Sequence, residues 1–156
     1  AGLQLQGDER LFDLYCGVGT FALPLARSAA RVTGIEDSPG AVRAAERTAE
    51  ANKLTNTRFR AGPVERAISD YQHGAEAIVL DPPRRGCHPR AIEEMLRLNP
   101  RRIAYVSCHP GTLARDLKAL VAGGYTVTRV TPVDIFPQTP HIESVSVLEK
   151  QGPPSA

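Results

Sequence analysis

The chain has 156 residues, of which 42 % are apolar and 23 % charged, with a formal net charge of +2 at pH 7. This length and composition predict one globular domain that buries a core without disulfides or metal ions. No apolar run approaches the roughly 18 residues of a membrane span, and no signal peptide is visible. The near-zero charge argues against a dedicated electrostatic nucleic-acid binder.

The three cysteines, Cys16, Cys87 and Cys108, lie too far apart for the C-x-x-C spacing of zinc or cluster sites. An odd number of cysteines without such spacing is typical of a protein in a reducing compartment. We therefore expect a soluble, cytoplasmic, metal-free domain.

Short apolar runs alternate with helical patterns along most of the chain. Buried strands are predicted where an apolar run ends at a glycine, a proline or a polar residue, at 11–16, 31–36, 57–62, 77–81 and 102–108. Helices are predicted from apolar spacing at 20–30, 39–52, 64–71, 89–98 and 110–122. Ser38 is the expected N-cap of the second helix, with Pro39 at its first position.

The last third of the chain changes its pattern. Gly123 and Gly124 end the fifth helix, and residues 125–130 and 143–148 then alternate with period two. Two consecutive strands without a helix between them predict an antiparallel pair at the sheet edge. The fold class is therefore α/β, with a doubly wound, mostly parallel, seven-stranded Rossmann-like sheet over residues 1–150 and a loose tail at 151–156.

In open α/β sheets, ligands bind beyond the carboxyl ends of the strands. The residues that end the five predicted parallel strands are chemically distinctive: Cys16 with Gly17, Glu36, Gly62, Asp81 and Cys108. Because these ends meet at one edge of the sheet, a binding site is expected there.

The first strand end carries a glycine motif. Residues 16–22 fit G-x-G-x-x-A, whose two glycines, Gly17 and Gly19, allow a tight turn and close approach of a ligand. Glu36 ends the second strand, 17 residues after Gly19, where a carboxylate can accept hydrogen bonds from both ribose hydroxyls. Together they indicate an adenosine-type cofactor, either NAD or S-adenosylmethionine, without choosing between them.

The fourth strand ends in Asp81-Pro-Pro-Arg-Arg-Gly86. Two prolines set a rigid turn without free N–H groups, which holds the Asp81 carboxylate beside a pocket suited to a planar polar group. This arrangement favours an enzyme that methylates planar bases over a dehydrogenase. The alternative is a turn that simply stops the strand.

Two further segments carry reactive groups. In Ser107-Cys108-His109-Pro110, a thiol at a strand end precedes a helix whose N-terminus favours the thiolate, although a buried structural cysteine is the alternative. Residues 136–143 deliver His141 and Glu143 to the same edge, where Glu143 can serve as a general base. A surface hairpin with incidental charges is the alternative for that loop.

Four ordered motifs, at residues 13–19, 81–84, 107–116 and 136–143, together resemble the S-adenosylmethionine-dependent RNA uracil-5 methyltransferases. Those enzymes form 5-methyluridine in transfer RNA and large-subunit ribosomal RNA. The resemblance implies that Cys108 is the nucleophile that adds to C6 of uracil and that Glu143 removes the C5 proton. It also implies S-adenosylmethionine as cofactor, an RNA partner and a monomeric enzyme. The expected cofactor contacts are Tyr15, Gly17, Gly19, Glu36 and Asp81, and the expected substrate contacts are Asp81, Pro82 and Arg84.

The chain departs from this family in two respects. The family usually has Asn where this sequence has His109. Family members also carry an upstream segment, many an RNA-binding barrel and some an iron–sulfur cluster, and none of these patterns is found in these 156 residues. We therefore expect the catalytic domain of a longer enzyme, with residues 1–6 as the end of a preceding helix.

Alternatives are a cytosine-5 or other RNA methyltransferase, and a cofactor- or RNA-binding module inactive on its own. An NAD-dependent oxidoreductase leaves the motifs at 81–86 and 107–116 unexplained.

Overall fold

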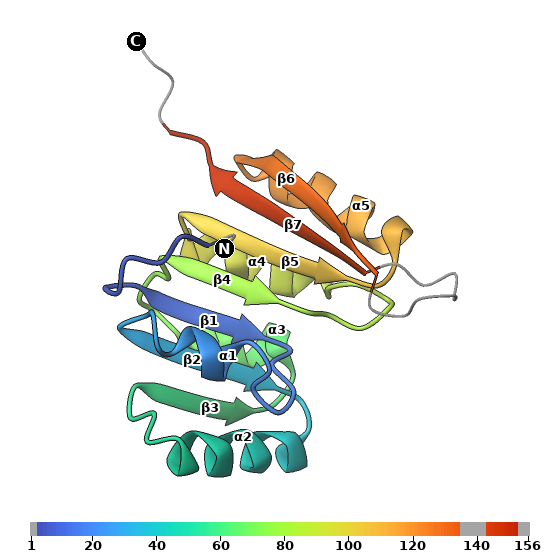
Figure 1. Ribbon diagram of the computed structural model, residues 1–156. Helices are drawn as coiled ribbons and strands as arrows, with labels where there is room; N and C mark the ends of the chain where they lie inside the picture. Colours follow the sequence, from blue (N-terminus) through green and yellow to red (C-terminus); the bar gives the residue numbers. More distant parts are fainter. Residues whose placement is uncertain (1–2, 135–142, 153–156) are drawn as a thin grey trace.

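The computed structural model of the chain describes residues 3–134 and 143–152. Its centre is a seven-stranded sheet in the order β3-β2-β1-β4-β5-β7-β6 (Figure 1). The strands are β1 (Arg10–Leu14), β2 (Arg31–Glu36), β3 (Thr57–Ala61), β4 (Ala77–Leu80), β5 (Arg102–Ser107), β6 (Tyr125–Val133) and β7 (Glu143–Lys150). The first five strands are parallel to one another, and β7 pairs antiparallel with both β5 and β6. The predicted α/β sheet with its antiparallel pair at the edge is confirmed.

The helices are α1 (Ala22–Leu25), α2 (Pro39–Ala51), α3 (Val64–Ala67), α4 (Pro89–Leu98) and α5 (Pro110–Ala122), with a 3₁₀ turn η1 (Ile68–Asp70). The side chain of Ser38 accepts a hydrogen bond from the Ala41 amide, so the predicted cap of α2 is confirmed. The predicted single helix at 64–71 is instead α3 followed by η1.

The first helix is much shorter than the prediction for residues 20–30. Pro24 lies inside it and has no N–H to donate to the preceding turn. Beyond Leu25 the backbone hydrogen bonds span three residues instead of four: the Arg27 amide donates to the Pro24 carbonyl and the Ser28 amide to the Leu25 carbonyl. After four helical residues the segment thus continues as turns.

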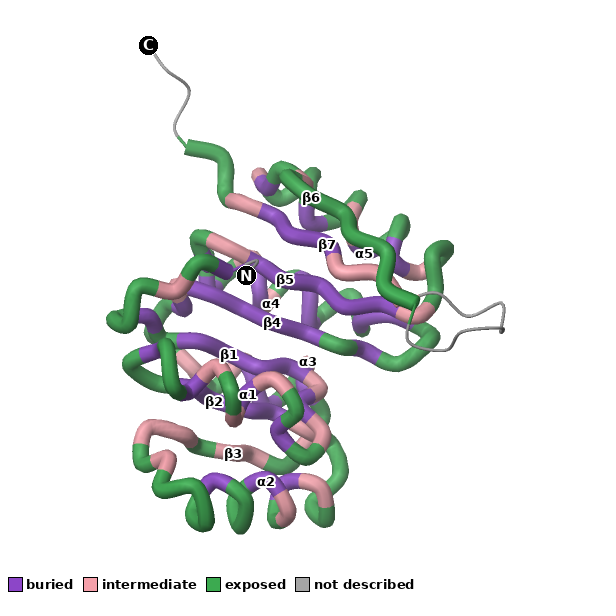
Figure 2. Tube along the Cα trace, viewed as in Figure 1, coloured by how far each residue is buried: buried purple, intermediate pink, exposed green. Residues whose placement is uncertain are grey.

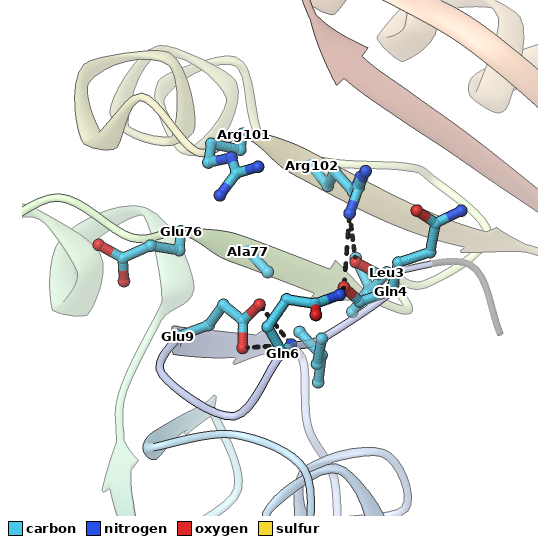
Figure 3. A pocket seen from close by; sticks show the side chains of 9 residues that line it. Leu3, Gln4, Gln6, Glu9, Glu76, Ala77, Arg101 and Arg102 are labelled. Carbon is cyan, nitrogen blue, oxygen red and sulfur yellow. Dashed lines mark hydrogen bonds between the residues drawn. The ribbon is translucent and has the colours of Figure 1, made fainter.

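The expectation of a helix end at residues 1–6 is wrong for the part that the structure describes. Residues 3–9 form neither helix nor strand. The Glu9 carboxylate accepts hydrogen bonds from the amides of Gln6 and Gly7, which fixes a turn just before β1. This segment borders a small cavity of about 170 Å³ at the amino edge of the sheet, where Arg102 donates to the Leu3 carbonyl (Figure 3). No predicted site residue lines this cavity.

Helices α3, α4 and α5 cover one face of the sheet and α1 lies on the other (Figure 1). The larger core cluster packs apolar strand residues such as Leu14, Leu80 and Ile103 against Met95 and Leu120 from the helices. The central strands β1, β4 and β5 are buried almost throughout, as Figure 2 shows. This rigid parallel centre brings the carboxyl ends of the strands to one edge. Within the described ranges no helix is long and apolar enough to cross a membrane.

Candidate active site

An open pocket of about 440 Å³ lies at the carboxyl edge of the sheet. It is lined by Tyr15, Glu36, Asp37, Pro63, Val64, Glu65, Asp81, Pro83 and Arg85. Three of the residues predicted to bind a cofactor, Tyr15, Glu36 and Asp81, thus share one pocket although they come from the ends of three different strands. Gly17, Gly19, Pro82, Arg84, Cys108 and Glu143 are not among its lining residues.

The glycine loop adopts a backbone conformation that its sequence permits. Tyr15, Gly17 and Gly19 have φ angles of 61°, 53° and 89°, in the left-handed region. A Cβ on Gly19 would lie 2.9 Å from Cγ of Leu23, so a side chain there is excluded by packing as well as by φ. The loop can therefore turn tightly between β1 and α1.

Glu36 is held by backbone groups on both of its oxygens. Oε2 accepts from the Gly17 amide at 3.1 Å, and Oε1 accepts from the Ser38 amide at 2.9 Å. A carboxylate has about four lone-pair sites, so capacity remains for two more donors. The carboxylate is thus immobilised at the end of β2, facing the pocket with free acceptor positions.

Tyr15 connects this pocket with the loop that follows β4. Burial raises the pKa of Tyr15, and a hydrogen bond with the backbone of His88 acts in the opposite direction. Tyr15 also lines a neighbouring pocket of about 330 Å³, together with Glu65 and residues 85–89. Its ring therefore forms part of the boundary between the two pockets.

Asp13, to which the sequence patterns assigned no role, lies completely buried in β1. Its Oδ2 accepts from the Ala22 amide at 2.7 Å, and Oδ1 has no hydrogen-bond partner among the described residues. Burial, reinforced by the negative charges of Asp81 and Glu36, raises the pKa of Asp13 from 3.8 to about 7. The signal in the sequence was a lone carboxylate inside an otherwise apolar run.

The expected nucleophile and base lie on adjacent strands. Cys108 is half-buried directly after β5, and Glu143 is the first residue of β7. The antiparallel register pairs Ser107 with Ser144, and the Ser144 hydroxyl donates to the Ser107 carbonyl at 3.3 Å. The pairing of β5 and β7 ends at Ser107 and Ser144, so Cys108 and Glu143 each adjoin the last residue pair of this ladder.

Asp81 lies near this pair. It remains open to solvent on one side, yet partial burial and the negative charge of Glu143 raise its pKa. The carboxylates of Asp81 and Glu143 are thus close enough for the charge of Glu143 to act on the Asp81 pKa. Asp81 and Cys108 follow β4 and β5, and Glu143 begins β7, the strand next to β5. His141 lies outside the described residues.

His109 caps α5. Its Nδ1 accepts a hydrogen bond from the Thr112 amide at 3.2 Å. Asparagine is among the most favoured N-cap residues, so a histidine ring nitrogen here performs the task for which Asn is well suited. His109 therefore supports the helix that follows Cys108.

Of the remaining predicted substrate residues, Pro82 is buried and Arg84 is exposed. The Arg84 carbonyl accepts from the Thr112 hydroxyl at 3.1 Å, so this loop is attached to α5.

Over the described residues, no group of three His, Cys, Asp or Glu side chains is placed to hold a metal ion.

The family model of the tRNA (uracil-5-)-methyltransferases matches residues 3–151. A curated relative from Gloeobacter violaceus, named an uncharacterized RNA methyltransferase, is 48 % identical over 149 residues, covering 96 % of this chain and 32 % of its own length. A relative of the same description from Thermotoga maritima is 47 % identical, covering 94 % of this chain and 33 % of its own length. The chain thus spans about a third of the length of these relatives.

Solved structures show the same likeness. The crystal structure of Pyrococcus abyssi tRNA (uracil-54, C5)-methyltransferase in complex with S-adenosyl-L-homocysteine matches with a TM-score of 0.81 and 35 % identity. The match covers 92 % of this chain and 35 % of that one. A Streptococcus thermophilus rRNA methylase shares the fold, with a TM-score of 0.78 at 15 % identity, over 96 % of this chain and 92 % of that one. With a family model matched over nearly its whole length, the chain belongs to the tRNA (uracil-5-)-methyltransferase family.

Proposed function

We propose that this chain is the catalytic domain of an enzyme that transfers a methyl group from S-adenosylmethionine to C5 of a uridine in RNA. The observation that supports the proposal is the pairing of β5 and β7 up to Ser107 and Ser144, the neighbours of Cys108 and Glu143, with Asp81 at the end of the adjacent strand β4. Family membership supports it, as does the likeness to the Pyrococcus abyssi enzyme, which is named for a uracil C5 reaction and was solved with S-adenosyl-L-homocysteine.

The pocket residues fit S-adenosylmethionine. Glu36 has free acceptor positions for two ribose hydroxyls, and Pro63 with Val64 offers apolar surface for a flat ring. The carboxylate of Asp81 supplies negative charge near a cationic ligand, and Tyr15, Gly17 and Gly19 shape the loop beside it. When bound, S-adenosylmethionine supplies an electrophilic methyl group.

Uracil needs activation because its C5 is a weak nucleophile. In the proposed mechanism the Cys108 thiolate forms a bond to C6, and the electron pair of the C5–C6 double bond moves to C5 and the neighbouring carbonyl. After C5 has gained the methyl group, the Glu143 carboxylate takes the C5 proton. The released electron pair restores the C5–C6 double bond, and the Cys108 thiolate leaves.

The loop after β4 orients the base. Asp81 accepts the N3–H of uracil, a donor that cytosine lacks, while Pro82 and Arg84 hold the nucleotide beside it. This assignment favours uracil over the cytosine-5 alternative. A base within a stacked helix cannot reach such a pocket, so the target uridine must be unstacked, at a cost of about a few kcal/mol.

The RNA is a transfer or ribosomal RNA, and the names of the family and of the Pyrococcus abyssi protein favour transfer RNA. We further propose that the enzyme acts in the cytoplasm as a monomer. Mass-spectrometric analysis of transfer and ribosomal RNA from cells lacking the full-length gene tests this, because nucleosides from the target RNA should lack 5-methyluridine and its nuclease fragments should name the modified position.

The mechanism is tested by trapping. RNA containing 5-fluorouridine has no removable C5 proton, so the full-length protein with S-adenosylmethionine should form a stable adduct on the peptide that carries Cys108. Cys108→Ala should abolish the adduct, whereas Cys16→Ala should retain it because the Cys16 side chain is buried, at 3 % exposure. An adduct that persists in Cys108→Ala refutes the mechanism. Cofactor binding without adduct or methyl transfer to any RNA favours a binding module.

A further inference from the structure

We propose that Asp116 is a positioning residue that, together with Thr112 and Arg115, holds the loop after β4 in register with Cys108. These three residues of α5 are called the loop-binding cluster below. The inference deepens the proposed function and rests on it, because the loop carries Asp81, and α5 begins two residues after Cys108.

Asp116 receives three hydrogen bonds on its two carboxylate oxygens. Oδ2 accepts from the Cys87 amide at 2.7 Å and from the Tyr105 hydroxyl at 2.6 Å. Oδ1 accepts from Nε of Arg115 at 2.9 Å. All three partners are hydrogen-bond donors, so this position requires a side chain with two acceptor oxygens.

The rest of the cluster binds the carbonyl groups of the same loop. The Thr112 hydroxyl donates to the Arg84 carbonyl at 3.1 Å. Nη2 of Arg115 donates to the Arg85 carbonyl at 3.0 Å and to the Cys87 carbonyl at 3.3 Å. Side chains of α5 thus bind the backbone at three of the four positions between 84 and 87.

Gly86, the remaining position, shows how closely the loop approaches the helix. Its φ is +76°, and a Cβ there would lie 2.5 Å from Nη2 of Arg115 and 2.6 Å from Oδ2 of Asp116. Only glycine allows the backbone to approach this closely. The motifs at 81–86 and 107–116 are therefore two sides of one contact.

Helix packing alone does not require a carboxylate at this place. Asp116 is 3 % exposed, and the other buried residues of α5 are Leu113 and Leu120. In many proteins, replacing a buried ionic group by apolar residues of similar volume does not lower stability, because a buried charge is costly to desolvate. The carboxylate instead serves the loop that it binds.

Cys87 belongs to this contact and has no role as a nucleophile. It is buried, and its Sγ lies 3.7 Å from the Tyr105 hydroxyl. Burial raises the pKa of Cys87 to about 12, so the thiol stays protonated. The two cysteines that precede a His-Pro pair, Cys87 and Cys108, thus have different tasks.

The test uses Asp116→Asn in the full-length protein. An asparagine has one acceptor oxygen, so its amide group must face either the Arg115 donor or the Cys87 and Tyr105 donors. We expect adduct formation with 5-fluorouridine RNA to slow by roughly 100-fold, the size expected for a displacement of about 1 Å near the reacting atoms. The affinity for S-adenosylmethionine should fall much less than the adduct rate, because Glu36 holds the ribose from β2 without contact to the cluster, whereas only the Asp81 side of the pocket belongs to the loop.

A matched pair tests the same contact without touching a buried charge. Thr112→Val removes the hydroxyl bound to the Arg84 carbonyl and should slow adduct formation roughly threefold to tenfold, as expected for one neutral hydrogen bond. Thr112→Ser keeps the hydroxyl and should restore most of the wild-type rate. Equal rates in the two variants overturn the role of the cluster.

Hydrogen exchange measures the positioning directly. Amides of residues 84–88 should exchange faster in Asp116→Asn, while amides of β1, β4 and β5 remain as in the wild type. An unchanged loop, a wild-type adduct rate, or a parallel loss of cofactor binding and adduct formation overturns the inference. If the wild type itself forms no adduct, the proposed function fails, and the exchange of residues 84–88 still decides whether Asp116 holds the loop.

Discussion

The most direct physical test of the buried centre is the substitution Asp13→Asn. Asp13 is fully buried under the glycine loop, and burial with the charges of Asp81 and Glu36 raises its pKa from 3.8 to about 7. The folded protein therefore binds more protons than the unfolded chain between these two pH values. It follows that the free energy of unfolding falls as the pH rises through this window.

The magnitude follows from the two pKa values. At about 1.4 kcal/mol per pH unit, ionising Asp13 in the folded state costs roughly 4 kcal/mol above pH 7 relative to strongly acidic solution. About 2.5 kcal/mol of this cost arises between pH 5 and pH 8. The asparagine of the variant does not titrate, and its oxygen can still accept from the Ala22 amide. Its NH₂ group adds a pH-independent cost of roughly 1–3 kcal/mol if it remains without a partner.

The assay is urea unfolding at pH 5 and pH 8, followed by far-ultraviolet circular dichroism because the chain has no tryptophan. The stability of Asp13→Asn relative to the wild type should increase by about 2.5 kcal/mol from pH 5 to pH 8. Asp8→Asn is the control for the same replacement at a carboxylate that is exposed. If Asp13→Asn shows the same difference at both pH values, the folded protein does not hold the additional proton and the reasoning is wrong.

Two further predictions concern the groups around the pocket. Glu36→Ala should weaken S-adenosylmethionine binding by about 1.5–3 kcal/mol for each charged hydrogen bond lost, as measured by titration calorimetry; unchanged affinity would remove Glu36 from the ribose site. His109→Ala should lower the free energy of unfolding by about 1 kcal/mol through loss of the α5 cap, while His109→Asn should keep most of it. Equal losses in the two His109 variants would show that the cap contributes nothing.

Much of the fold follows from local patterns. Apolar runs ending at glycine, proline or polar residues predicted the strands of the parallel part, and the change to period two predicted β6 and β7 as an antiparallel pair. These predictions succeed because a strand that is buried on both faces is apolar at consecutive residues, whereas a strand that is buried on one face is apolar at every second residue. The prediction fails at residues 20–30, where the chain leaves α1 after Leu25 and continues in turns.

The convergence of strand ends was also predictable in outline. In a parallel sheet the carboxyl ends lie at one edge whatever the strand order, so Glu36 and Asp81 were expected near each other, and the pocket confirms this. The order of the strands in the sheet could not be predicted in this way, because it depends on which segments distant in the sequence pack against one another. Only the insertion of β7 between β5 and β6 sets Glu143, the first residue of β7, at the edge of the strand that Cys108 follows.

By itself, then, the sequence determined the class of the fold, the edge at which a site forms and the residues with reactive groups. Tertiary structure alone decided the roles of Asp13 and Asp116, two buried carboxylates that each accept a hydrogen bond from a backbone amide outside their own strand or helix. Asp13 bonds to Ala22 nine residues on, and Asp116 bonds to Cys87 29 residues before it. A carboxylate's pKa and its hydrogen-bond partners depend on the groups that surround it in space, and these are set only when the strands and helices pack together.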